Sequence, residues 1–278
     1  MNLFDIIDQI EQVDPEIQQR LDSRRSAIKN ITSFGSKVAL AAMPFALGTM
    51  FKKAYGAAPA NVVEVLNFAL TLEYLEAEFY NVGTQKAVVP AANSAYIANI
   101  TRDENNHVTF LKTVIGQLGG TPVAKPNIDL SGGNGSGNGP FKDAFTNYSL
   151  FLTVAQAFED TGVRAYKGQA GALKGNKTVL TAALSIHAVE ARHAAAIRQL
   201  RYNLGSTATR PWIISTASKG NDTGVALVDA NYAGEENVTQ GGVNLSSLGS
   251  IGAVTAAFDE PLTYDQVIAL LVGSFIVA

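Results

Sequence analysis

Four long stretches of the chain carry apolar residues at intervals of three and four, which is the spacing of an amphipathic helix. They run from about 61 to 82, 93 to 118, 141 to 167 and 177 to 204. Asn61 is placed to cap the first helix, while Gly83 and Gly119-Gly120 are expected to end the first and second. In the fourth stretch the spacing places Leu184 on the inward face. We therefore predict an all-α fold built on a four-helix bundle, over residues 59–205.

The connection between the second and third helices is long. Residues 119–140 hold three prolines and a tract of Gly, Asn and Ser, so they are expected to cross over along the bundle without forming a helix. This tract is not a phosphate-binding loop, because no strand precedes it and it lacks a Gly-Lys-Ser/Thr ending. The third and fourth helices are joined by a short turn that contains glycine. The bundle therefore has one long crossover connection.

A loop-rich extension follows the bundle at residues 206–278. It is rich in Ser, Thr, Asn and Gly and contains Trp212, the only tryptophan. Thr263 is predicted to cap a short apolar helix that begins at Tyr264. That helix is too short to span a bilayer, so we expect it to pack on the bundle. No catalytic motif is present in this segment.

The first 58 residues precede the bundle. Residues 1–22 have an acidic amphipathic pattern, which predicts a surface helix or a flexible leader. Residues 23–29 (SRRSAIK) precede an apolar run at 38–51 that is too short to span a membrane. This arrangement resembles a twin-arginine export signal, although Ala27 stands where Phe is usual. The resemblance implies export to the periplasm; the alternative is an ordinary helix packed on the bundle of a cytoplasmic protein.

A repeated set of residues interrupts the inward faces of the four predicted helices. In the first half, Glu73 is followed by Tyr80, and 31 residues after Glu73 comes the run Glu104-x-x-His107. The same residue types recur 86 positions later, at Glu159, Tyr166, Glu190 and His193. One Glu-x-x-His run is a weak signal, whereas two runs related to single glutamates by one internal offset form a specific one.

Composition limits the chemistry that this repeat can perform. The formal net charge is −3, and no basic patch supports nucleic-acid binding. The chain has no cysteine, which excludes disulfides, thiolate metal sites and a nucleophilic Cys. Only three histidines are present, so a metal site must be rich in carboxylates. Such a site suits iron or manganese better than softer ions.

The spacing of the repeat explains how these residues could hold two metal ions. Residues three apart on a helix share a face, so each Glu-x-x-His run presents a carboxylate and an imidazole to one point. Together with the two single glutamates, the predicted ligands are Glu73, Glu104, His107, Glu159, Glu190 and His193. Four ionised carboxylates buried together would repel one another, and two divalent cations neutralise them. A single-metal or decayed version of this site is the alternative.

Residues 61–205 resemble the ferritin-like superfamily. Within them, the stretches LNFALTLEYLEAEFY and ALSIHAVEARHAAAIR closely resemble an exported, desiccation-related group of ferritin-like proteins. The resemblance implies that Glu73 and His107 bind one metal ion and that Glu159 and His193 bind the other. Glu104 and Glu190 would bridge the two ions. The implied cofactor is a pair of iron ions, or alternatively of manganese ions.

Further residues are candidates for supporting roles. By the same resemblance, Tyr80 and Tyr166 match tyrosines found near such centres, although they are equally well interpreted as core aromatics with a satisfied hydroxyl. In some ferritin-like families an Asp before the Glu-x-x-His run serves the opposite His, and Asp103 fits this role for His193. Its counterpart is Val189, so the two metal positions are not expected to be equivalent.

Two residues remain open to more than one interpretation. His187 lies one turn before Glu190 and could be an extra ligand or a proton carrier, but a packed core histidine is the plainer reading. Glu76 stands where the second half has Gly162, and it could be an additional carboxylate. A salt bridge at the rim of the bundle is its simpler interpretation.

Three classes of function fit these features. A di-iron or di-manganese oxidoreductase would act on ferrous iron, dioxygen or peroxide, as a ferroxidase or a catalase. A protective, non-enzymatic protein would use the metal pair only to hold the bundle together. Iron storage in a closed shell is disfavoured, because the extension would obstruct the packing of a cage. The sequence leaves the oligomeric state open.

Overall fold

The structure is a computed structural model that describes residues 61–206, 209–214 and 226–278 of the 278-residue chain. The predicted helix at 1–22, the export-like signal at 23–51 and the boundary near residue 58 lie outside the described residues. In the part of the chain described, no helix is both long enough and apolar enough to cross a membrane.

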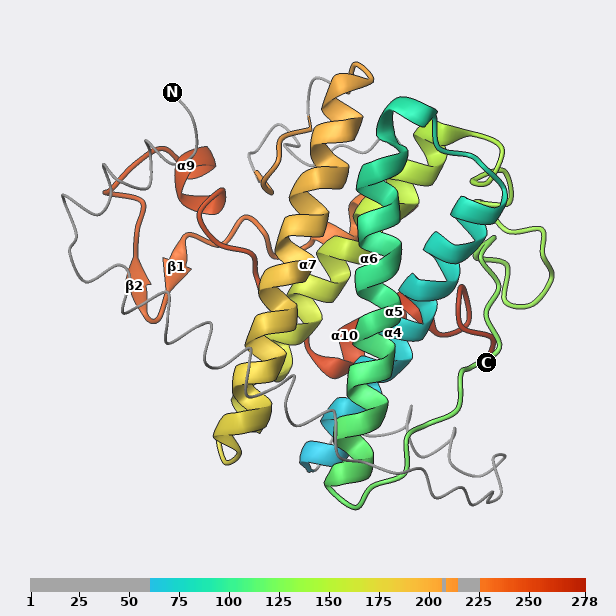
Figure 1. The fold of residues 1–278 in the computed structure, drawn as a ribbon. Coiled ribbons are helices and arrows are strands. Elements are labelled where there is room, and N and C mark those ends of the chain that lie inside the picture. Colours follow the sequence, from blue (N-terminus) through green and yellow to red (C-terminus); the bar gives the residue numbers. More distant parts are fainter. Residues whose placement is uncertain (1–60, 207–208, 215–225) are drawn as a thin grey trace, which may run out of the picture. The chain divides into compact units, whose positions relative to one another are not determined.

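Four long helices form the body of the protein (Figure 1). They are α4 (Val62–Gln85), α5 (Ser94–Gln117), α6 (Tyr148–Gln169) and α7 (Lys177–Asn203). α4 packs mainly on α5, α6 packs mainly on α7, and α4 and α6 contact each other. The predicted four-helix bundle is confirmed, with a long connection between α5 and α6 and the short 3₁₀ turn η3 (Ala170–Leu173) between α6 and α7.

Asparagine side chains fix the starts of three of these helices. The side chains of Asn61, Asn147 and Asn176 each accept a hydrogen bond from the backbone N–H three residues later. Each of these N–H groups would otherwise lack a partner, because the first turn of a helix has no preceding carbonyls. α5 instead follows the 3₁₀ turn η2 (Ala91–Asn93) and has no side-chain cap.

The predicted end of α4 at Gly83 is wrong. The helix continues to Gln85, and Gly83 is buried inside it. A Cβ atom at this position would lie 2.4 Å from a ring carbon of Phe151, which is fully buried on α6. The glycine therefore permits close approach of α4 and α6, and it does not act as a stop signal.

Replacing Gly83 by alanine is expected to lower the free energy of unfolding by about 1–3 kcal/mol, because the buried Phe151 ring has to shift. Gly116→Ala is the matched control, since that glycine also lies in a helix, α5, but meets no atom within 4 Å. The control should gain about 0.4–1 kcal/mol. Urea denaturation of both variants measures the difference, and equal stability of the two would contradict this account of Gly83.

Two further details differ from the prediction. α6 begins at Tyr148 and not near residue 141; the preceding residues form turns, from which buried Phe141 stacks on Phe275 at a centroid distance of 5.3 Å. Leu184 is exposed, because the inward face of α7 is formed by Ala183 and Ile186 at that level.

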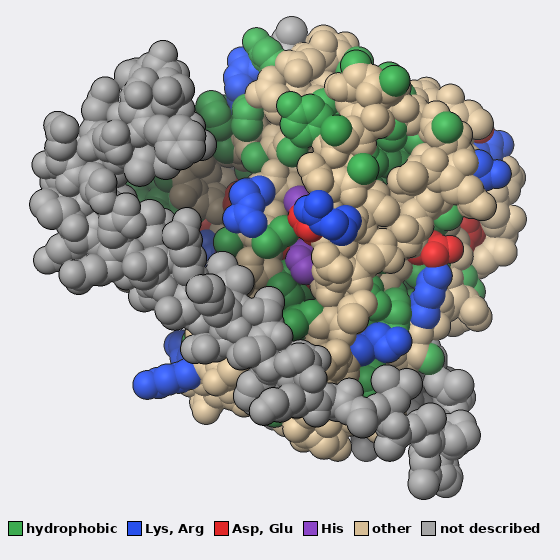
Figure 2. All heavy atoms as spheres, viewed as in Figure 1, with side chains coloured by type: hydrophobic (Ala, Val, Ile, Leu, Met, Phe, Trp, Pro, Cys, Tyr) green, Lys and Arg blue, Asp and Glu red, His purple; other side chains and the backbone are tan. Residues whose placement is uncertain are grey.

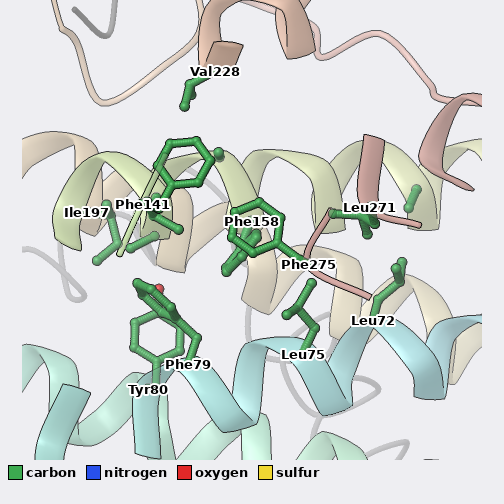
Figure 3. Close-up of a cluster of buried hydrophobic side chains, with 14 of the residues drawn as sticks. Leu72, Leu75, Phe79, Tyr80, Phe141, Phe158, Ile197, Val228, Leu271 and Phe275 are labelled. Carbon is green, nitrogen blue, oxygen red and sulfur yellow. The ribbon is translucent and has the colours of Figure 1, made fainter. Parts of the chain in front are cut away.

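One of two apolar core clusters lies largely between α4, α6 and the C-terminal part of the chain (Figure 3), and the other is formed by residues of the four bundle helices and η3. Phe158 of α6 and Phe275 meet edge to face at 4.8 Å. Figure 3 also shows Leu72 of α4 near Leu271, which belongs to the short helix α10. The core of the bundle is therefore completed by residues from the end of the sequence.

The C-terminal part is made of short elements. They are α8 (Ala226–Asp229), η4 (Ala230–Tyr232), the antiparallel hairpin β1 (Thr239–Gln240) and β2 (Val243–Asn244), α9 (Ile251–Thr255) and α10 (Tyr264–Leu271). Thr263 and Gln266 form a capping box at the start of α10, which confirms the predicted cap. α10 packs against α6, also as predicted.

Buried arginines attach the C-terminal part to the bundle. Asp160 of α6 accepts hydrogen bonds from Arg198 of α7 and from the hydroxyl of Tyr232. Arg164 of α6 forms an ion pair with Glu235, at 2.9 Å, and donates to the backbone carbonyl of Glu260, at 2.8 Å. Every residue of α6 from Phe151 to Tyr166 is consequently buried.

The crossover is held by the end of the chain. Ile128 forms an antiparallel bridge with Ile276, and the backbone N–H of Asp129 donates to the carbonyl of Phe275. The Asp129 carboxylate accepts from the backbone N–H groups of Gly135 and Gly137, at 2.8 and 3.0 Å. The glycine tract thus wraps around its own aspartate, which leaves no free anion-binding loop there.

Candidate metal centre

The six predicted ligands converge in the middle of the bundle. Glu73 comes from α4, Glu159 from α6, and the two Glu-x-x-His runs from α5 and α7. All four carboxylates have no exposed surface, and His107 and His193 are 8% and 6% exposed. Such burial of charged groups is tolerated only where something compensates the charge.

The six side chains form two overlapping groups. Glu73 and His107 lie with Glu104 and Glu190 in one group, and Glu159 and His193 lie with the same two glutamates in the other. Within each group the potential ligand atoms lie within 4.8 Å of one another. Glu104 and Glu190 belong to both groups, which is the arrangement that two bridged metal ions require.

The imidazoles point their Nδ1 atoms into this cluster. His107 Nδ1 lies 3.1 Å from Glu73 Oε2, 3.2 Å from Glu104 Oε2 and 3.1 Å from Glu190 Oε1. His193 Nδ1 lies 2.8 Å from Glu104 Oε1 and 3.4 Å from Glu159 Oε2. Each nitrogen therefore faces its own single glutamate and at least one shared glutamate.

Asp103 supports only one of the two imidazoles. Its Oδ2 lies 3.5 Å from Nε2 of His193, and its other oxygen accepts from Arg102. An acceptor on Nε2 favours the tautomer whose Nδ1 lone pair is free to bind a metal ion. His107 has Val189 at the equivalent place on α7, so its environment differs from that of His193.

The two tyrosines bind the single glutamates in a crossed arrangement. Tyr80 of α4 donates to Oε1 of Glu159 on α6, and Tyr166 of α6 donates to Oε1 of Glu73 on α4, at 2.5 Å. In both cases Oε2 is left facing an imidazole Nδ1. Each hydroxyl thus fixes one carboxylate oxygen and turns the other toward the centre. The crossed pairing is not visible in the sequence, which places each tyrosine seven residues from the glutamate of its own helix.

Unpartnered atoms show that the residues fit a pair of cations. Five buried atoms of the cluster have no hydrogen-bond partner: Glu104 Oε1, Glu159 Oε2, both oxygens of Glu190, and His193 Nδ1. Buried polar atoms are normally hydrogen-bonded, and a buried polar atom without a hydrogen bond lowers the stability of the fold by about 1–3 kcal/mol. The ligand atoms of each group lie within 4.8 Å of one another, as expected of oxygen and imidazole ligands for a metal ion. The cluster could therefore hold two metal ions.

The metal-free cluster is electrostatically unfavourable. Burial raises the pKa of Glu104 to about 7, and burial together with the charge of Glu104 raises the pKa of Glu190 well above its usual range. Burial alone would lower the pKa of His193, but the charge of Glu159 and the nearby carboxylate of Glu104 raise it to about 11. Glu73 is the exception: burial would raise its pKa, yet His107 holds it below the usual value. The metal-free protein therefore retains protons that a metal ion would displace.

These shifts predict that the metal-free protein loses stability as the pH rises from 5 to 9. Glu104 and His193 have folded-state pKa values above their unfolded values of 4.5 and 6.5, so they stabilise the fold at low pH. That stabilisation, on the order of a few kcal/mol, is lost as the pH rises through the folded-state values. Glu73, whose pKa is lowered, loses its contribution only below pH 4.5.

Denaturation in urea at several pH values, with chelator and then with Mn²⁺, measures this effect. Metal binding strengthens as protons leave the ligands, so the loss of stability should disappear in the metal-loaded protein. A metal-free protein whose stability is flat or rises between pH 5 and 9 would contradict the prediction.

The imidazole side of the centre lies close to the surface. Figure 2 shows histidine side chains on the face formed by α5 and α7, between Lys or Arg side chains. Arg102 on α5 and Arg192 on α7 are exposed residues adjacent in sequence to Asp103 and His193. The cluster is therefore separated from solvent on this face by little more than its own imidazoles.

The structure also places the two residues with open interpretations. His187 lies outside both groups and is half-buried near Val163, Lys167 and Asp259. Its charged neighbours are Lys167 and Asp259 and not the carboxylates of the cluster, so His187 lies apart from the candidate ligands. Glu76 is 3% exposed, and it forms no ion pair with a Lys, Arg or His among the described residues. The prediction that Glu76 forms a salt bridge at the rim of the bundle is wrong, because this carboxylate lies inside the bundle. Burial and the charges of Glu190 and Glu104 raise its pKa well above the usual range.

The comparison with protein families agrees with this geometry. Residues 61–203 match the model of the ferritin-like domain. This match covers more than half of the chain, and the protein belongs to the ferritin-like domain family. A search of curated proteins finds no match. Membership of the narrower exported, desiccation-related group remains a prediction.

Proposed function

We propose that the protein is an oxidoreductase with a dinuclear iron or manganese centre that acts on ferrous iron, dioxygen or hydrogen peroxide. The observation that carries the proposal is the fused, buried ligand set with four unpartnered carboxylate oxygens. Two such ions, when bound, supply redox chemistry and Lewis acidity next to each other.

The protein's own residues prepare this centre in three ways. Glu104 and Glu190 belong to both ligand groups and so set a short separation between the two positions. The hydroxyls of Tyr80 and Tyr166 hold the two single glutamates with one oxygen directed inward. Asp103 orients the His193 ring.

The burial of the cluster limits which reactants can reach it. The apolar helices around the cluster exclude bulk water, and the small exposure of the imidazoles leaves room only for small reactants. Ferrous iron, dioxygen and peroxide all meet this requirement. With no cysteine in the chain, electrons have to come from the substrate itself or from a separate donor.

The test is turnover by the full chain loaded with two equivalents of Fe²⁺ or Mn²⁺. Ferrous oxidation and peroxide disproportionation are measured for wild type and for two variants. Glu104→Ala, which removes a shared carboxylate, should lose activity by more than 10²-fold. Glu78→Ala should retain it, because Glu78 lies on the same helix as Glu73 but is paired with Lys125 outside the cluster.

The outcome distinguishes the candidate functions. Turnover with iron supports a ferroxidase, and turnover of peroxide with manganese supports a catalase. Two bound metal ions without either activity would overturn the enzymatic proposal in favour of a structural or protective role.

A further inference from the structure

Glu76 lies one turn after Glu73 on α4, and it is buried against the candidate metal centre. Among the described residues no basic side chain pairs with it, and its charged neighbours are the carboxylates of Glu190, Glu104, Glu73 and Glu159. An isolated buried carboxylate is costly, so its position requires an explanation. It is the only member of this group of five carboxylates that the internal repeat does not predict.

Gly162 of α6 provides the space that this carboxylate occupies. It is the counterpart of Glu76 in the repeat, 86 residues later. A Cβ atom at Gly162 would lie 3.1 Å from Glu76 Oε1 and 3.2 Å from Glu190 Oε2. A Cβ atom at this position would therefore crowd both oxygens, which would have to shift by a few tenths of an ångström. Glu190 Oε2 is fully buried and has no hydrogen-bond partner, and it faces the same gap as Glu76.

The gap lies on the α4–α6 side of the centre, whereas the imidazoles come from α5 and α7. A cavity of about 10 Å³ borders it, lined by residues of α4, α6 and α10: Leu72, Leu75, Glu76, Phe158, Thr161, Gly162 and Leu271. The lining is mostly apolar, and the Thr161 hydroxyl already donates to the carbonyl of Ala157. The cavity thus offers no counter-charge to Glu76.

The six predicted ligands leave the coordination of two metal ions incomplete. Each of the two groups supplies one imidazole and three carboxylates, and Glu76 lies outside both, with its Oε1 and Glu190 Oε2 bordering the same space beside Gly162. Iron and manganese accept six oxygen or nitrogen ligands, so neither group completes the coordination with one atom per residue. A further carboxylate on the α4–α6 side could supply one of the ligands that the two groups lack.

We propose that Glu76 is a seventh ligand of the metal pair, contributed from the α4–α6 side. The lack of a side chain at Gly162 leaves the space that the Glu76 carboxylate occupies. This inference rests on the proposed metal centre. It makes the two halves of the bundle chemically unequal, since the second half has no carboxylate at the matching place.

The test uses Mn²⁺ alone and needs no activity measurement. Metal-free full-length protein is titrated with Mn²⁺, and the loss of the free-ion electron paramagnetic resonance signal counts bound ions and gives their affinities. Glu76→Gln keeps the shape of the side chain and removes its charge. Glu78→Gln is the matched control, two residues along the same helix and outside the cluster.

Wild type and Glu78→Gln should bind two Mn²⁺ ions with similar affinities. Glu76→Gln should bind at least one of them about 10–100-fold more weakly, as expected for loss of a ligand. Two sites in Glu76→Gln with the affinities of the control would overturn the inference. Gly162→Ala, which keeps Glu76 but fills the gap, should weaken the same site; unchanged binding there would also contradict the proposal.

The failures of the two proposals are distinguishable. If wild type binds two ions and has turnover while Glu76→Gln binds them equally well, only the role of Glu76 is wrong. If wild type shows no turnover but Glu76→Gln loses affinity, only the enzymatic proposal is wrong. Absence of Mn²⁺ binding by wild type would overturn both. If Glu76→Gln failed to fold, the Gly162→Ala titration would decide the question.

Discussion

Replacing Glu190 by alanine is expected to abolish paired metal binding, leaving at most one ion per chain. Glu190 belongs to both ligand groups, and both of its oxygens are buried without hydrogen-bond partners. Its loss therefore removes a ligand from each position at once. The same result is expected for Glu104→Ala, which affects the other shared carboxylate.

The loss should also appear as a change in stability. A ligand that binds only the folded state at 100 times its dissociation constant adds about 2.7 kcal/mol to the free energy of unfolding. Wild type should gain stability from added Mn²⁺, and Glu190→Ala should gain much less. Elemental analysis of dialysed protein and thermal melts with and without Mn²⁺ measure both effects. Two retained ions per chain in the variant would refute the assignment of Glu190 as a shared ligand.

The second large effect is expected at Arg198. Replacing Arg198 by alanine should lower the free energy of unfolding by about 3–5 kcal/mol, because it leaves Asp160 buried without its cation. Arg198 is 2% exposed, binds both oxygens of Asp160, and lies 5.5 Å from the centre of the Tyr232 ring. The change would also weaken the attachment of the C-terminal part to the bundle.

Two companion variants isolate the cause. Arg198→Met combined with Asp160→Asn removes both charges and should cost much less than Arg198→Ala alone. Lys125→Ala breaks the surface pair with Glu78 and should change stability by no more than about 1 kcal/mol. Urea denaturation gives all three values. A cost for Arg198→Ala as small as that for Lys125→Ala would show that the buried pair does not hold the fold together.

The ligand cluster could be predicted from the sequence because its motifs are short and occur twice. Each Glu-x-x-His run is readable within one helical turn, and the offset of 86 residues links the two halves without any knowledge of packing. The position of Asp103 beside His193 followed from the resemblance to ferritin-like families and not from the repeat, which has Val189 at the matching place. The helix caps at Asn61 and Thr263 were likewise visible in a few neighbouring residues.

The burial of the polar face of α6 could not be predicted from the sequence in this way. Gln156, Asp160 and Arg164 look like a solvent-facing stripe, yet all three are buried. Their partners, such as Tyr232 and Glu235, lie about 70 residues further along the chain. Nothing in the local pattern distinguishes a polar face covered by a distant segment from one covered by water.

Glycine and glutamate in α4 were misread for a related reason. Gly83 looks like a stop signal, but the contact that explains it is with Phe151 on another helix. Glu76 looks like a rim residue until Gly162 is seen to open a gap beside it. In both cases a close approach between α4 and α6 decides the outcome, and helical periodicity carries no information about such distances.

Anomalous X-ray diffraction from crystals of the full chain loaded with Mn²⁺ or Fe²⁺ is the most direct test of the metal centre. Two peaks about 3.5–4 Å apart are expected, one beside Glu73 and His107 and the other beside Glu159 and His193, with Glu104 and Glu190 touching both. A single peak, or peaks outside this cluster, would contradict the central claim that the bundle is built around a pair of metal ions.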